Sequence, residues 1–268
     1  MSTRLGTLGL HLEGRPCRGA CPFCYLGARP PSSGPGLSPT VAAEVVAALS
    51  AREIAVAISE PADTWRAHFE AIRGAAAARA LPFTVTTTPA VAAAAPWLAD
   101  GCTRLALSVD PVKGPVDPAA LSALAARLAR PGLEVMALVT LVSPAFVAEL
   151  AAGLLARLLD APGIDAVALN GLKPPPPWMG KEGWLRFLAG IGPLLDEHLE
   201  QRLHLDCFVA ARIVGLGDCP GKTDVAAGRE FRRCVYQPHA DLVFADAAEL
   251  ARRLADFAVP TVCPFAIV

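Results

Sequence analysis

The chain has 268 residues, of which 53% are hydrophobic, and its 24 basic and 25 acidic side chains give a net charge of −1. This length suits one α/β domain with a small appendage, and the apolar content is enough to bury a sizeable core. The balanced charge lacks the basic surplus of nucleic-acid-binding proteins, so we expect no nucleic-acid partner.

The N-terminal residues lack the long apolar stretch of a secretory signal peptide. The charge-free run 80–99 contains three prolines, so we interpret it as a strand, a turn and a helix and not as a membrane span. We therefore expect a cytoplasmic protein with no membrane partner. In that compartment the eight cysteines are expected to be core thiols or metal ligands, not disulfides.

Seven apolar, β-rich runs alternate with alanine-rich stretches along the chain. Most of the runs are continuously apolar, which is typical of parallel strands buried on both faces. The predicted strands are 7–12, 54–58, 83–87, 104–109, 134–141, 165–170 and 203–208.

Four of the predicted helices begin with a capping side chain followed by proline, which is favoured at the first helical position. These pairs are Ser38-Pro39, Thr88-Pro89, Asp117-Pro118 and Ser143-Pro144. The repeated order of strand, loop and helix predicts an α/β fold with a parallel sheet. Right-handed crossovers would curl this sheet into a partial (β/α)6 TIM-like barrel.

The pattern changes after residue 205 to turn-rich segments with short β-like pieces. A last helix is predicted over 246–257, where Asp246 and Glu249 have the spacing of a capping box. We therefore expect two parts, a barrel at 1–205 and a small cysteine-containing C-terminal extension at 206–268.

Three cysteines follow the first predicted strand in the segment RPCRGACPFCYLG, namely Cys17, Cys21 and Cys24. In a parallel α/β barrel, this strand end belongs to the face that carries the active site. A structural zinc site needs four ligands, whereas a four-iron cluster held by three thiolates keeps one iron open. Three thiols therefore predict a metal cluster that binds a further molecule.

This C-x3-C-x2-C motif within a strand–helix repeat resembles the signature of radical S-adenosylmethionine (radical SAM) enzymes, over roughly residues 5–175. The resemblance implies that the three cysteines hold a [4Fe–4S] cluster, which binds S-adenosyl-L-methionine. Reductive cleavage would give a 5′-deoxyadenosyl radical that abstracts hydrogen from a small-molecule or peptide substrate. A reductant such as flavodoxin or ferredoxin would be a partner.

The resemblance also implies which residues line the cofactor cavity. Phe23 would lie near the adenine, and Glu60 with its neighbour Ser59 would accept hydrogen bonds from the amino group of S-adenosylmethionine. Further strand ends that would line the cavity carry Thr87, Ser108, Asp110 and Asn170. The catalytic residues are not identified by the sequence.

The C-terminal extension resembles the short auxiliary-cluster domain (twitch or SPASM-like) of some radical SAM enzymes. By this resemblance, a second [4Fe–4S] cluster would be held by Cys207, Cys219, Cys234 and Cys263. Zinc bound by these cysteines and the absence of any metal are the two alternatives.

Two other functions stay open at this point. One is a non-enzymatic scaffold that binds zinc or an iron–sulfur cluster, and the other is a radical SAM methyltransferase. Cys102, which precedes the fourth predicted strand, is interpreted as a core thiol. His11, in the first predicted strand, is interpreted as a core histidine and is given no function.

Overall fold

The computed structural model of the chain describes residues 5–12, 36–59, 62–172, 178, 181–199, 201–206, 209, 222–226, 228–234 and 239–255. The chain divides into two compact units, which are described separately. Unit 1 comprises residues 1–87, 100–104 and 219–261, and unit 2 comprises residues 88–99, 105–218 and 262–268.

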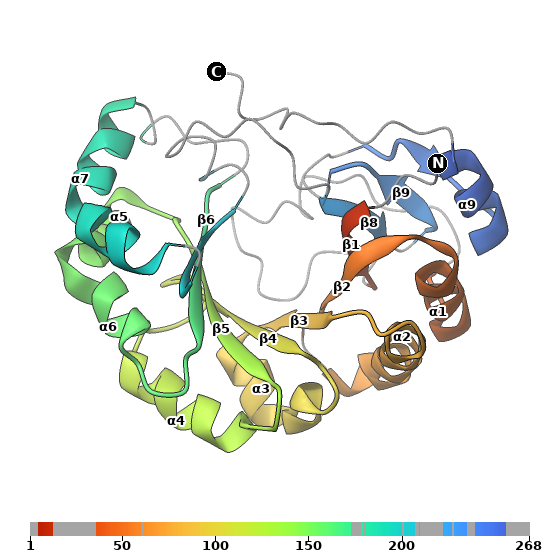
Figure 1. Cartoon of the computed structure of the whole chain (residues 1–268), viewed down its shortest axis with the longest axis horizontal. Helices are drawn as coiled ribbons and strands as arrows, with labels where there is room; N and C mark the ends of the chain where they lie inside the picture. Colours follow the sequence, from red (N-terminus) through yellow and green to blue (C-terminus); the bar gives the residue numbers. More distant parts are fainter. Residues whose placement is uncertain are drawn as a thin grey trace. The chain divides into compact units, whose positions relative to one another are not determined.

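The sheet of unit 1 has the strand order β10-β9-β8-β1-β2-β3 (Figure 1). Its strands are β1 (Leu5–His11), β2 (Ala51–Ala57), β3 (Phe83–Thr87), β8 (Lys222–Ala226), β9 (Glu230–Arg232) and β10 (Leu242–Val243). The pairs β1–β2, β2–β3 and β1–β8 are parallel, whereas β9 runs antiparallel to β8 and β10. The predicted C-terminal extension thus adds a strand directly beside β1.

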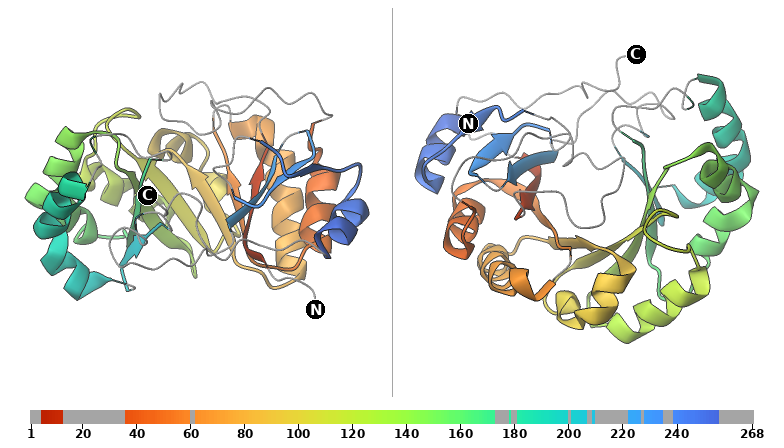
Figure 2. Two further views of the ribbon diagram at one scale, coloured as in Figure 1. Left: turned by 90° about the horizontal axis from the view of Figure 1, so that it is seen from above. Right: turned by 180° about the vertical axis from the view of Figure 1, so that it is seen from behind.

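The helices of unit 1 cover one face of this sheet. They are η1 (Ala62–Trp65), α1 (Pro39–Ala48), α2 (Arg66–Ala78) and α9 (Ala247–Ala255). Helix α1 contacts both α2 and α9, and both views in Figure 2 show α9 beside α1. The two phenylalanine rings of α2 and β3, Phe69 and Phe83, pack with their centroids 5.5 Å apart. This contact identifies the helix-covered face of β3.

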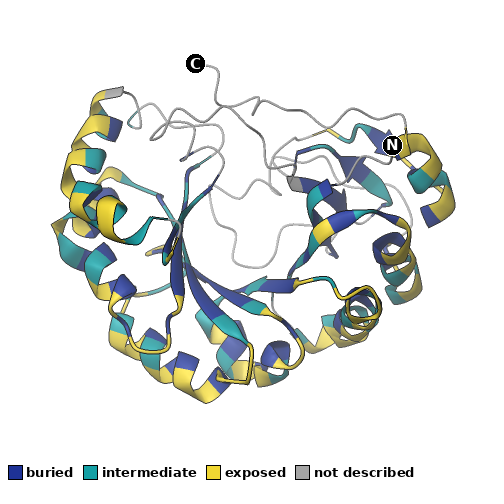
Figure 3. Cartoon of the chain, in the orientation of Figure 1, coloured by how far each residue is buried: buried dark blue, intermediate teal, exposed yellow. Residues whose placement is uncertain are grey.

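Unit 2 has the strand order β4-β5-β6-β7, with β5–β6 and β6–β7 parallel. Its strands are β4 (Arg104–Val109), β5 (Glu134–Thr140), β6 (Ala166–Asn170) and β7 (Leu203–Leu205). Its helical segments are α3 (Pro89–Ala94), η2 (Pro96–Ala99), α4 (Pro118–Leu128), α5 (Pro144–Glu149), η3 (Leu150–Leu154), α6 (Leu155–Leu159) and α7 (Lys181–His198). Figure 3 shows buried strands and helices whose outward faces are exposed.

The predicted α/β fold with a mostly parallel sheet is confirmed. Each predicted strand is present, although β2 begins earlier, at Ala51, and β7 ends earlier, at Leu205. The four predicted N-caps are also confirmed, because each side chain accepts a hydrogen bond from a main-chain N–H of its helix. The boundary at residue 205 stays a prediction.

Two side-chain hydrogen bonds cap the N-terminus of the last described helix, α9. Asp246 Oδ1 accepts a hydrogen bond from Glu249 N at 2.7 Å, and Glu249 Oε2 accepts one from Ala245 N at 2.7 Å. This agrees with the predicted capping-box spacing. Among the described residues, none of the helices combines the length and apolarity that crossing a membrane requires.

Candidate functional site

Three polar side chains meet at the carboxyl end of β4, and we call them the β4 cluster: Ser108, Asp110 and Lys113. Ser108 and Asp110 lie two residues apart, so they share one face of the strand, and both are buried. The turn after the strand returns Lys113, whose Nζ lies 2.6 Å from Ser108 Oγ and 2.6 Å from Asp110 Oδ2. The cluster therefore holds one ammonium group between a hydroxyl and a carboxylate.

Asp110 also shapes the turn that carries this lysine. Its Oδ1 accepts hydrogen bonds from the main-chain N–H groups of Val112, at 3.1 Å, and of Lys113, at 3.2 Å. One carboxylate oxygen thus orders the turn while the other pairs with the ammonium. The sequence did not predict Lys113, because a lysine in a turn resembles any solvated surface charge.

The carboxyl ends of β5 and β6 continue the same edge of unit 2. Thr140 and Asn170 are directly opposite each other in the parallel ladder, and both are half-buried. Neighbouring strands lie about 4.8 Å apart, so Asn170 is two strand spacings from β4. The structure thus brings Ser108, Asp110 and Asn170 to one edge, and their predicted role in cofactor binding stays a prediction.

Asp206, which follows β7, fixes the loops at this edge. Its side chain is buried, with Oδ2 accepting from Gly171 N at 3.2 Å and Oδ1 from Val209 N at 2.7 Å. The sequence did not single out Asp206, because its partner Gly171 is 35 residues away. The residue holds the main chain after Asn170 in place.

Two predicted cavity residues lie in unit 1, at the ends of β2 and β3. Ser59 follows β2 and is half-buried. Thr87 is buried and shares the helix-covered face of β3 with Phe83, and its Oγ1 donates to Ile58 O at 2.7 Å. Its hydroxyl therefore ties the ends of β2 and β3 together, and Thr86 lies on the opposite face.

Eight of the other predicted site residues lie outside the described part of the chain. They are Cys17, Cys21, Phe23, Cys24, Glu60, Cys207, Cys219 and Cys263. Cys234 is described and is buried. Within the described ranges, no group of three or more His, Cys, Asp or Glu side chains is arranged to hold a metal ion. The prediction that each of the seven cysteines is a metal ligand is not tested by these observations and stays a prediction.

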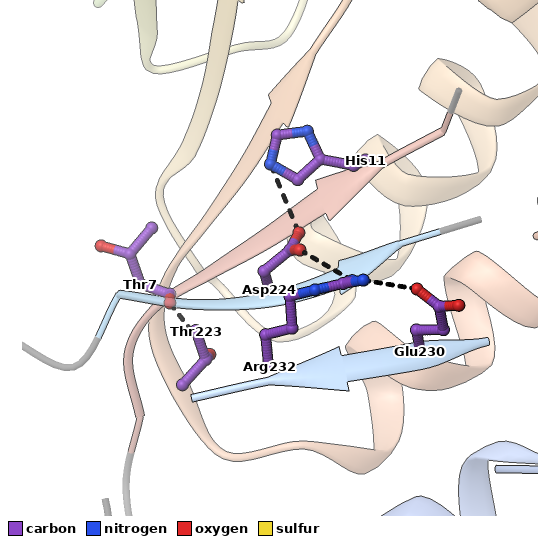
Figure 4. Close-up of polar contacts among 6 residues, drawn as sticks. All are labelled: Thr7, His11, Thr223, Asp224, Glu230 and Arg232. Atoms are coloured by element: carbon purple, nitrogen blue, oxygen red, sulfur yellow. Dashed lines mark hydrogen bonds and ion pairs between the residues drawn. The ribbon is translucent and has the colours of Figure 1, made fainter. Parts of the chain in front are cut away.

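A second group of polar side chains lies in unit 1, and we call it the His11 cluster: His11, Asp224, Arg232 and Glu230 (Figure 4). His11 Nε2 is 3.3 Å from Asp224 Oδ1, and Arg232 Nη1 is 3.7 Å from Asp224 Oδ2. Arg232 Nη2 lies 2.5 Å from Glu230 Oε2. The interpretation of His11 as a core residue is confirmed by its burial, and the sequence did not predict its partners.

Cys102 lies before β4 and is buried, as expected of a core thiol. Burial raises the pKa of this thiol to about 12, from the usual 9.0. Because only the thiolate is nucleophilic, we expect iodoacetamide to alkylate Cys102 of the native chain roughly a thousandfold more slowly than a free thiol at pH 8. Peptide mapping by mass spectrometry would measure this, and rapid native alkylation would contradict the burial.

The same shift predicts how stability depends on pH. The folded thiol keeps its proton above pH 9, whereas the unfolded thiol loses its proton there, so the unfolded state binds fewer protons between pH 9 and pH 12. The contribution of Cys102 to stability is complete below pH 9 and declines as pH rises toward 12. Cys102→Ser should reduce this decline.

Comparisons with known proteins give little positive support for any family. No family model matches the chain, and no curated protein matches it. A solved structure that is similar is dihydropteroate synthase (FolP) from Thermus thermophilus, at 22% identity and a TM-score of 0.38. The match covers 81% of this chain and 78% of that one. We draw no conclusion about activity from a likeness of this size.

These comparisons contradict the predicted membership in the radical SAM superfamily. No family model and no curated protein supports it, and the described residues contain no group of side chains arranged to hold a metal ion. We therefore withdraw the [4Fe–4S] cluster, S-adenosyl-L-methionine, the radical mechanism and the second cluster of a twitch or SPASM-like extension. The scaffold and methyltransferase alternatives are withdrawn with them, and the substrate and reductant partners and the cytoplasmic location stay predictions.

Proposed function

We propose that the chain is an enzyme that acts on a small molecule with an anionic group, bound at the carboxyl end of β4. The observation that carries this proposal is the position of Lys113 Nζ, 2.6 Å from both Ser108 Oγ and Asp110 Oδ2. In α/β proteins with parallel strands, binding sites are found at this end of the strands.

The β4 cluster contains two polar groups, an ammonium and a hydroxyl, that the turn after β4 does not need in order to form. The two hydrogen bonds from main-chain N–H groups to Asp110 Oδ1 are enough to form the turn after the strand. Neither the ammonium of Lys113 nor the hydroxyl of Ser108 takes part in those bonds. A buried hydroxyl and a buried carboxylate that both hold one ammonium favour a binding role over a purely local one.

The chemistry of this edge fits a small anionic ligand. An ammonium group binds carboxylate or phosphate oxygens, and these charge-assisted hydrogen bonds are stronger than neutral ones. Asp110 and Ser108 keep the ammonium in place before a ligand arrives, which lowers the entropic cost of binding. Thr140 and Asn170 add neutral hydrogen-bonding groups for the rest of the molecule.

We also propose a specific form of the α/β fold, namely a partial barrel. Parallel pairing of β1 with β2, of β2 with β3, and of β5 with β6 supports a partial (β/α)6 TIM-like barrel. A parallel strand, β8, lies on the other side of β1. In such a barrel the carboxyl ends of the strands would form the face that binds the substrate.

A titration of the 15N-labelled full chain with inorganic phosphate tests the proposed site. We expect amide shifts centred on residues 108–113 and 140, with further shifts near Asn170. Lys113→Met should weaken phosphate binding roughly tenfold, because one charge-assisted contact is lost. Arg130→Met is the matched control, since it removes an exposed cation at the other end of α4, and it should leave binding unchanged.

Two outcomes of this titration would overturn the proposal. One is a set of phosphate-induced shifts confined to other parts of the chain. The other is equal binding by the native chain and Lys113→Met. Ser108→Ala gives an independent measure, because it removes a hydroxyl that holds the ammonium without changing the charge.

A further inference from the structure

Two partly exposed polar side chains, those of Thr140 and Asn170, stand side by side at the carboxyl ends of β5 and β6. Each is the last residue of its strand. Within the described part of the chain, neither side chain has a hydrogen-bond partner. A carboxamide and a hydroxyl can each donate and accept, so the pair offers both kinds of hydrogen bond to a ligand.

Asp206 holds the main chain on both sides of Asn170. Its N–H donates to Leu169 O at 3.0 Å, and its Oδ2 accepts from Gly171 N at 3.2 Å. The carbonyl of Asn170 itself accepts from Leu141 N at 2.9 Å. Both peptide groups that flank Asn170 are therefore fixed, and so is the direction in which its side chain leaves the main chain.

A loop-fastening role for Asp206 is the competing explanation. The bond from Val209 N to Asp206 Oδ1, at 2.7 Å, serves that role, because it orders the chain that follows β7. The bond to Gly171 N instead reaches the residue after Asn170. A purely structural role also does not explain why a rigidly held residue carries an amide that is partly exposed and unpartnered among the described residues.

The distance from the β4 cluster sets the size of the ligand. Strands β4, β5 and β6 are consecutive in the sheet of unit 2 (Figure 1), and neighbouring strands lie about 4.8 Å apart. A ligand whose anionic group is bound by Lys113 must therefore extend past Thr140 to reach Asn170. Several bonds must separate its anionic group from the group that meets the amide.

We propose that this edge binds the phosphate or carboxylate of a polyhydroxylated molecule, with Asn170 as the residue that selects its hydroxyl groups. Asp206 is the positioning residue that holds Asn170 for this contact. Hydroxyl groups donate and accept, as the amide and the Thr140 hydroxyl do. This inference rests on the proposed function, because Lys113 supplies the anion contact, and it names the substrate class of that site.

The same pair would disfavour an anion with an apolar body. Such a ligand would cover the amide of Asn170 and the hydroxyl of Thr140 without replacing their hydrogen bonds to water. A polar group that is desolvated and left unpaired lowers affinity, so a site of this kind discriminates against ligands that lack hydroxyl groups.

Calorimetric titration of the full chain with three phosphates tests the substrate class. The probes are sorbitol 6-phosphate, which has hydroxyl groups and no carbonyl, phenyl phosphate and inorganic phosphate. We expect sorbitol 6-phosphate to bind roughly tenfold more tightly than inorganic phosphate, because the hydroxyl groups add hydrogen bonds. Phenyl phosphate should bind no more tightly than inorganic phosphate. Asn170→Ala should remove the advantage of sorbitol 6-phosphate and leave the binding of inorganic phosphate unchanged.

Asp206→Asn tests the positioning role, because an asparagine has one acceptor oxygen where the aspartate has two. We expect the advantage of sorbitol 6-phosphate to fall roughly threefold, with inorganic phosphate bound as before. Asp165→Asn is the matched control, since Asp165 Oδ2 accepts from Val135 N at 2.7 Å at the amino ends of β5 and β6. A merely structural role would lower the stability of the variant without changing the ratio of the two affinities.

A measurement on the native chain keeps the positioning role testable even where Asp206→Asn does not fold. The amide of Gly171 should exchange its hydrogen slowly, because Asp206 accepts its hydrogen bond. Rapid exchange at Gly171 in the native chain, or an advantage of sorbitol 6-phosphate that folded Asp206→Asn keeps in full, would contradict the role of Asp206.

Three results would overturn the inference as a whole. They are sorbitol 6-phosphate bound no more tightly than inorganic phosphate, phenyl phosphate bound more tightly than sorbitol 6-phosphate, and an advantage of sorbitol 6-phosphate that Asn170→Ala keeps. Failure of the proposed function looks different, because then none of the three phosphates binds, or Lys113→Met binds them equally. Binding of all three with equal affinity contradicts this inference alone.

Discussion

Replacing Arg232 by methionine is expected to lower the free energy of unfolding by about 3 to 5 kcal/mol. The Arg232 side chain is 1% exposed, and the Asp224 side chain opposite it is fully buried. Methionine fills much of the same space but carries no charge, so the two carboxylates of Asp224 and Glu230 lose the cation between them. A buried charge that loses its partner costs several kcal/mol. Urea denaturation measures the loss.

The neighbouring residue Arg233 provides the control for this experiment. Its side chain is 38% exposed and pairs with Asp241, so Arg233→Met should cost less than about 1 kcal/mol. The double variant Asp224→Asn/Arg232→Met should be more stable than the sum of the single losses predicts, because both charges are removed. A loss for Arg232→Met as small as that for Arg233→Met would show that the His11 cluster is not a buried charge network.

Replacing Phe69 by alanine is expected to lower the free energy of unfolding by about 3 to 5 kcal/mol. The ring is fully buried and packs against Phe83, with centroids 5.5 Å apart. Its removal leaves a cavity between α2 and β3 that the surrounding helix and sheet can fill only in part. The loss combines the transfer energy of the ring with the cost of that cavity.

Leu185→Ala is the control for this cavity. Leu185 is 56% exposed, so its truncation should change stability by no more than about 0.5 kcal/mol. Both variants can be measured by urea denaturation on the full chain. A loss of less than about 1 kcal/mol for Phe69→Ala would contradict the described packing of α2 on β3.

Local features of the fold were predictable from the sequence. The Ser-Pro, Thr-Pro and Asp-Pro pairs predicted four helix starts, because both the cap and the proline act within one helical turn. The continuous apolar runs predicted the strands, because burial on both faces of a sheet requires apolar side chains throughout. Strand ends were less predictable, as β2 and β7 show.

The polar clusters depended on tertiary structure and could not be predicted in the same way. Asp224 meets His11 only because β8 lies beside β1, more than 200 residues away in the chain. Lys113 meets Ser108 only because the turn after β4 folds back. Thr87 was predicted to face the cofactor cavity. Because side chains alternate between the two faces of β3, Thr87 instead lies on the helix-covered face together with Phe83.

The cofactor prediction depended on a different kind of signal, three cysteines within a short segment. Such a segment specifies a possible ligand set but not the fold around it, and Cys17, Cys21 and Cys24 lie outside the described residues. The comparisons with known proteins did not support the family that the motif suggested. The functional proposals therefore depend on polar side chains whose contacts are described.

The central claim is that Lys113 binds an anionic group at the carboxyl end of β4. A crystal structure of the full chain grown in sodium phosphate tests it most directly, with Lys113→Met grown under the same conditions. The account predicts a phosphate ion within hydrogen-bonding distance of Lys113 Nζ in the native chain and no ion there in the variant. A Lys113 ammonium enclosed only by protein groups, with no phosphate in contact, would contradict it.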